Sequence, residues 1–85
     1  MKSLPIVEVH WVDSAFCRGW QTLENKRHDQ GIVTCRSIGY LLSSDKKEVR
    51  LVGSQGFDHM TKGEPDVADG LSIPRVAVKR IRRIK

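Results

Sequence analysis

The sequence has few of the features that mark secreted or membrane-bound proteins. Only two cysteines, Cys17 and Cys35, occur among its 85 residues. The opening segment MKSLPIVEVHWVD is charged and alternating, where a signal peptide has a continuous apolar run. No stretch approaches the roughly 20 consecutive apolar residues that span a bilayer. We therefore expect a protein of the cytosol, with reduced thiols and no membrane partner.

Motifs for catalysis, metals and cofactors are equally scarce. The residue types that bind metals are His10, Cys17, His28, Cys35 and His59. No Cys-x-x-Cys or His-x-x-x-His pair gives them the spacing of a zinc site. Cys17 with His10 and Asp13 would supply a nucleophile, a base and an orienting acid, but nothing local supports that geometry, and an inert thiol is favoured. The glycines of VGSQGF are not followed by the Gly-Lys-Ser/Thr of a phosphate-binding loop. The sequence predicts no enzyme, no metal site and no cofactor.

The length fits one small domain over residues 1–85. A domain of this size buries only roughly 60% of the surface that its unfolded chain exposes, so its stability is marginal. Burial of a face against a second copy would add to that stability. We therefore expect a homo-oligomer.

Alternation of apolar and polar residues predicts strands. In PIVEVHWV, Val7, Val9 and Trp11 fall on one face, while Glu8 and His10 fall on the other. The segment GIVTCRSIGYLLS is rich in β-branched residues and long enough for a bent strand, with Gly39 as a bulge or a point of close approach. SSDKKE predicts a hairpin turn. The returning strand EVRLVGS has Val49 and Leu51 inward and Arg50 outward.

One short helix is expected after the first strand. The segment WQTLENKRHDQG predicts a helix or helical turn with Trp20 and Leu23 facing inward and Gly31 at its end. Together with the strands, it predicts a mainly β fold, a small SH3-like or Sm-like barrel.

The last segment, IPRVAVKRIRRIK, admits two interpretations. Its ending resembles that of SH3-like barrels, in which a single 3₁₀ turn after a proline precedes the final strand, here after Pro74. A helix competes because apolar residues recur every three positions, but strand is favoured by the β-branched content. A bulge or 3₁₀ turn near residues 78–80 would direct four apolar residues inward, namely Val76, Val78, Ile81 and Ile84. It would leave the basic residues outward or along the edge of the sheet, namely Lys79, Arg80, Arg82 and Arg83.

The positive charge is concentrated at this end of the chain. Residues 75–85 contain six basic side chains and no acidic one, whereas residues 1–74 contain nine basic and ten acidic. The segment GFDHMTKGEPDVADG carries four acids around one lysine: Asp58, Glu64, Asp66 and Asp69. We expect it to be a solvated acidic loop that is exposed or approaches the basic tail of its own or a neighbouring chain.

A longer pattern is formed by residues spread along the chain: Trp11, Asp13, Ser14, Gly19, Trp20, Ser37, Gly39, Tyr40, Leu41, Ile73 and Pro74. This pattern resembles a family of small uncharacterised proteins of tailed bacteriophages. The resemblance covers nearly the full length. It implies a small β-barrel and a phage accessory role in the cytoplasm of an infected bacterium, and it carries no established activity to any residue.

Basic and aromatic residues define the candidate binding site. The predicted ligand-binding residues are Lys79, Arg80, Arg82, Arg83, Trp20 and Tyr40. Arginine forks suit phosphate groups, and aromatic faces stack on bases. The first hypothesis is a non-catalytic phage protein that captures a phosphate-bearing ligand, for example a nucleotide signal of host defence. The alternatives are a small barrel that binds RNA or DNA and a protein inhibitor of a host factor.

Overall fold

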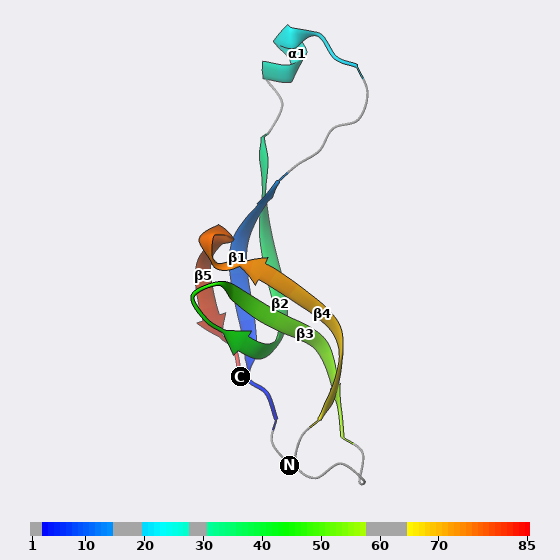
Figure 1. Cartoon of the computed structure of the whole chain (residues 1–85), viewed down its shortest axis with the longest axis vertical. Helices are drawn as coiled ribbons and strands as arrows, with labels where there is room; N and C mark the ends of the chain where they lie inside the picture. Colours follow the sequence, from blue (N-terminus) through cyan, green and yellow to red (C-terminus); the bar gives the residue numbers. More distant parts are fainter. Residues whose placement is uncertain (1–2, 15–19, 28–30, 58–64) are drawn as a thin grey trace.

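In the computed structural model, the chain forms one antiparallel sheet that carries a short helix at the end of a long hairpin (Figure 1). The structure describes residues 3–14, 20–27, 31–57 and 65–85. Its elements are β1 (Ile6–Ser14), α1 (Leu23–Arg27), β2 (Ile32–Ser44), β3 (Glu48–Gly56), β4 (Asp66–Pro74), the 3₁₀ helix η1 (Arg75–Ala77) and β5 (Val78–Arg83). The strand order β4-β3-β2-β1-β5 makes β4 and β5 the two edges of an open sheet. The mainly β class, with one short helix after the first strand, is confirmed.

The core lies on the inner face of the sheet. Its buried members are Val7, Val9, Val49, Leu51 and Ile73, and Trp11, Leu41, Ala77, Val78 and Ile81 pack against them. In a flat sheet, β4 and β1 would lie about 14 Å apart, three strand spacings. The sheet curves strongly (Figure 1), and Ile73 of β4 joins the β1 valines in one cluster. The predicted inward faces of β1 and β3 are confirmed.

Gly39 of β2 is a point of close approach, as predicted. A Cβ atom at this position would lie 3.0 Å from the backbone oxygen of Val52 on β3. Only a residue without a side chain fits that distance without a shift of the neighbouring strand. The irregularity in β2 lies nearby, where the pairing with β3 shifts between Leu41 and Ser43.

The hairpin between β2 and β3 is organised by one carboxylate. Asp45 Oδ1 accepts hydrogen bonds from the backbone N–H groups of Lys47, at 2.8 Å, and Glu48, at 2.9 Å. These bonds hold the pKa of the Asp45 carboxyl below its ordinary value of 3.8, the bond from Glu48 having the larger effect. The turn predicted from SSDKKE is confirmed.

The C-terminal segment follows the strand interpretation. The 3₁₀ helix η1 comes directly after Pro74, and β5 pairs antiparallel with β1. His10 is opposite Arg80 and Trp11 is opposite Val78, so Lys79 is the extra residue of a β-bulge. The 3₁₀ turn, the strand and the bulge are thus confirmed.

Two of the four apolar side chains predicted to face inward do not. Val78 and Ile81 are half-buried against the core, but Val76 is 93% exposed and Ile84 is 46% exposed. Val76 belongs to η1, where its neighbour Ala77 makes the contact with the core instead. Ile84 follows Arg83, which is opposite the inward-facing Val7, so strand alternation places Ile84 on the outer side.

The acidic segment is not simply a loop. Asp66 and Asp69 belong to β4, which pairs with β3 from Gly56 opposite Asp66 to Glu48 opposite Pro74. Pairing with a formed strand overrides the low β-propensity of aspartate. Asp69 has φ of 62°, a left-handed conformation that aspartate tolerates better than most residues. Asp58 and Glu64 lie outside the described residues.

The helix α1 lies away from the core, contrary to expectation. The molecule measures 59 × 24 × 21 Å, and the β1–β2 hairpin carries α1 to one end of its long axis (Figure 1). Leu23 is 66% exposed and Trp20 is fully exposed, so neither faces a core. The helix begins where Thr22 Oγ1 accepts a hydrogen bond from the Asn25 backbone N–H, and it ends at Arg27, before Gly31.

Candidate functional site

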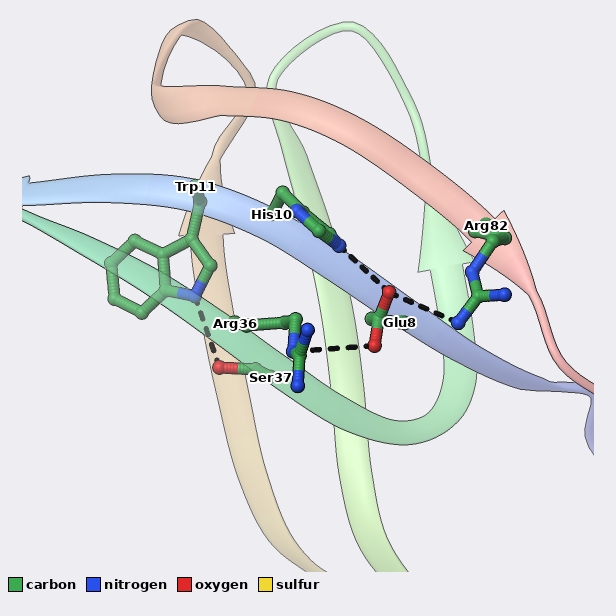
Figure 2. A network of polar contacts seen from close by, with 6 residues as sticks. All are labelled: Glu8, His10, Trp11, Arg36, Ser37 and Arg82. Carbon is green, nitrogen blue, oxygen red and sulfur yellow. Dashed lines mark hydrogen bonds and ion pairs between the residues drawn. The ribbon is translucent and has the colours of Figure 1, made fainter.

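A buried carboxylate marks the face of the sheet opposite the core. Glu8 of β1 alternates with the core residues Val7 and Val9, so its side chain leaves on the outer face, yet the residue is only 5% exposed. Three side chains cover it (Figure 2). His10 Nε2 lies 2.7 Å from Oε1, Arg82 Nη2 donates to Oε1 over 3.3 Å, and Arg36 Nε lies 3.4 Å from Oε2.

Strand register explains why these groups meet. His10 is opposite Arg36 of β2 and Arg80 of β5, and Glu8 is opposite Arg82 of β5. Residues directly opposite one another in neighbouring strands share a face. His10, Arg36, Arg80 and Arg82 therefore lie with Glu8 on the outer face of β2, β1 and β5. We call these five residues the outer basic face.

Cations exceed the carboxylate on the outer basic face. Three arginines oppose one glutamate, and the side chains of Arg36 and Arg82 remain 66% and 54% exposed. The pKa of Glu8 lies below its ordinary value of 4.5, because of the hydrogen bond with His10 and then the charges of Arg82 and Arg36. Glu8 is thus ionised at neutral pH. It holds two guanidinium groups in place while leaving most of their surface open to a ligand.

The residues predicted to form the site are only partly brought together. Arg80 and Arg82 lie on the outer basic face. Lys79 is the bulge residue, and Arg83 is opposite Val7, so Arg83 leaves on the inner face at the end of the core. All four are exposed, as predicted.

The two predicted aromatic residues lie far apart. Tyr40 of β2 is opposite Ile6 of β1. Ile6 precedes Glu8 by two residues, so Tyr40 lies on the same outer face as Glu8. It is half-buried and adjoins the outer basic face. Trp20 lies three residues before the start of α1, and α1 stands at the remote end of the β1–β2 hairpin (Figure 1). Tyr40 can act with the arginines, and Trp20 cannot.

Three members of the outer basic face were missed as site residues: Glu8, His10 and Arg36. The alternation of the first strand did place Glu8 and His10 on the outward face. Arg36 gave no such signal, because its position opposite His10 depends on the pairing register of two strands that are distant in sequence.

A hollow of about 220 Å³ lies on the other half of the sheet, across β3 and β4. Apolar side chains line it, including Leu42, Val52 and Leu71, with Arg50 and Asp69 of opposite charge also on its wall. Apart from Leu42 of β2, its lining residues belong to β3 and β4, which contribute nothing to the outer basic face.

The described residues form neither a metal-binding cluster nor a helix that could cross a membrane. No group of three or more His, Cys, Asp or Glu side chains there could hold a metal ion. Of the described helices, none has the length and apolar character needed to cross a membrane. Cys17, considered as a nucleophile, lies outside the described residues.

Comparison of the chain with protein-family models, curated proteins and solved structures finds no match.

Proposed function

We propose that this chain is a non-catalytic protein that binds a phosphate-bearing ligand on the outer basic face, and that the ligand is a single strand of RNA or DNA. The observation that carries the proposal is that Arg36 of β2 and Arg80 and Arg82 of β5 share one face with the buried carboxylate of Glu8 on β1, between the two strands. Guanidinium groups bind phosphate oxygens through paired hydrogen bonds as well as charge.

The openness of the face favours a strand over a small nucleotide. Sites for small molecules are concave and bury most of the ligand. Arg36 and Arg82 instead expose more than half of their side chains. Arg80 and Arg82 are about 7 Å apart along β5, and Arg36 is about 10 Å from Arg80 across two strand spacings. Such an array suits several phosphates of an extended backbone.

Residues beside the cations supply surfaces for bases. Ile38 is directly opposite Glu8 and is 60% exposed, and Tyr40 follows it on the same face. Binding of single strands without sequence preference combines a basic track with such apolar and aromatic platforms. The resemblance to small phage proteins extends the proposal to a phage accessory protein in the cytoplasm of an infected bacterium, where single-stranded nucleic acid is present.

The proposal is tested by fluorescence anisotropy with a labelled single-stranded oligonucleotide, with mononucleotides and cyclic dinucleotides as competitors. The oligonucleotide should bind, and equal phosphate concentrations of the small nucleotides should compete poorly. If a small nucleotide binds saturably and raises the melting temperature while the strand does not bind, the protein captures nucleotides instead. If no phosphate-bearing ligand binds, the proposal is wrong.

A matched pair of aromatic variants tests the location of the site. Tyr40→Leu should weaken binding of the strand by about 1–3 kcal/mol, the range found for loss of base stacking on an aromatic ring. Trp20→Leu removes a larger and more exposed ring, yet it should leave affinity unchanged because Trp20 lies away from the face. Equal losses in the two variants would place the site elsewhere.

A further inference from the structure

The two edges of the sheet carry opposite charge. Among the residues of β5, Lys79, Arg80, Arg82 and Arg83 are basic and none is acidic. Among the residues of β4, Asp66 and Asp69 are acidic and none is basic. β4 and β5 stand at opposite ends of the strand order, and among the strands of the described residues each has a partner on one side only. Each edge therefore presents unpaired backbone groups next to side chains of a single sign.

Exposed apolar side chains accompany the charges on both edges. Val67 and Leu71 of β4 are 43% and 37% exposed. Next to β5, Val76 is 93% exposed in η1, and Ile84 is 46% exposed. A contact between the two edges would cover apolar surface as well as pair charges. In a small domain, such burial adds to a marginal stability.

We propose that β5 of one copy of this chain lies along β4 of a second copy, so that copies associate head to tail. The charge pattern selects this arrangement. A symmetric contact of β5 with β5 would set the four basic side chains of one copy against those of another, and a contact of β4 with β4 would oppose the aspartates; like charges facing each other across strands are destabilising. Only the unlike pairing brings basic and acidic edges together.

A head-to-tail contact leaves one free edge of each kind at the ends of the assembly. Copies therefore add until the assembly closes into a ring or extends as a filament, and a dimer is not its natural end point. Arg80 and Arg82 belong both to the β5 edge and to the outer basic face, so the face of each copy borders the contact with the next copy. The assembly thus arranges several such faces side by side, but it does not depend on their ligand.

The test uses light scattering on the full chain with two complementary variants. The first, Lys79→Glu with Arg80→Glu and Arg83→Glu, makes β5 predominantly acidic like β4. The second, Asp66→Lys with Asp69→Asn, makes β4 basic like β5; asparagine is used at position 69 because it tolerates the left-handed φ. Lys46→Glu with Lys47→Glu, in the exposed β2–β3 turn, controls for the change in net charge.

The parent and the control should form species larger than a dimer at micromolar concentration and above. Each edge variant alone should be monomeric, because both of its edges then have the same sign, while its circular dichroism and melting curve show that it folds. An equimolar mixture of the two variants should associate again, since every contact between unlike copies pairs opposite charges. A monomeric parent, edge variants that associate as the parent does, or a mixture that stays monomeric would each overturn the proposal.

Discussion

Glu8 and Val9 are neighbours in sequence and almost equally buried, at 5% and 0% exposure, but for opposite reasons. Val9 lies on the inner face among apolar side chains that exclude water. Glu8 lies on the outer face beneath His10 and two arginines that remain largely in solvent. Burial on the inner face stabilises the fold through apolar area. Burial on the outer face fixes charged groups that a ligand can still reach.

The largest expected loss of stability comes from a substitution in the core on the inner face. Ile73→Ala removes the fully buried residue through which β4 joins the core, and it should lower the free energy of unfolding by about 2–5 kcal/mol. Ile81→Ala should lower it less, because Ile81 is only half-buried. Urea denaturation followed by circular dichroism measures both. If Ile81→Ala proves the more costly, the core is centred on β5 and the packing described above is wrong.

A smaller effect is expected where the outer face is broken at its centre. Glu8→Gln keeps the shape of the side chain but removes the charge that holds His10, Arg36 and Arg82, so stability at neutral pH should fall by less than in Ile73→Ala. The same change removes the one negative charge of the outer basic face, so affinity for a nucleic-acid strand should rise. Urea denaturation of this variant measures the expected fall in stability, and fluorescence anisotropy of the same preparation measures the expected rise in affinity. A loss of affinity would show that orientation of the arginines outweighs the added charge.

The pH dependence of stability separates the two faces further. Because the pKa of Glu8 is lower in the folded chain than its ordinary value of 4.5, its contribution is fully present above about that pH. It is lost as the pH falls from there through the lowered pKa of the folded state. Asp45 acts in the same direction from its ordinary value of 3.8. Acid titration of the melting temperature should therefore be flatter in Glu8→Gln with Asp45→Asn than in the parent, whereas Ile73→Ala should shift the whole curve.

Much of the fold could be predicted from the sequence because it depends on local pattern. Alternation of apolar and polar residues predicted that the valines of β1 and β3 face inward. The segment around Asp45 predicted a turn, and Pro74 predicted the 3₁₀ helix that follows it. β4 was missed since its aspartates disfavour a strand until β3 is there to pair with them. Trp20 was expected to face inward because a helix after the first strand normally packs on the core. The long β1–β2 hairpin instead carries this segment away from the core, and Trp20 is exposed.

The division of the basic residues between the two faces of the sheet could not be predicted for a related reason. A run of basic residues in sequence was treated as one surface, but a strand divides it between two faces, with Arg80 and Arg82 on one and Arg83 on the other. The bulge at Lys79 determines which side chains of β5 lie on the outer face and which on the inner face. The sequence predicted a bulge near residues 78–80 but not its exact position. Arg36 joins the group only through pairing of β1 with β2, which no local pattern specifies.

If the proposed function is right, position on the outer face, and not basic charge alone, determines binding of the nucleic-acid strand. This claim is tested most directly by two variants of β5 that lose the same charge: Arg80→Gln with Arg82→Gln on the outer face, and Lys79→Gln with Arg83→Gln off it. The measurement is the salt dependence of single-strand binding, with light scattering used to compare chains at the same oligomeric state. Three arginines that contact phosphates predict a slope of log K against log salt of about −2 for the parent, and one remaining arginine predicts about −0.7 for the outer-face variant. The off-face variant should keep the parent's slope. Equal slopes in the two variants would contradict the claim.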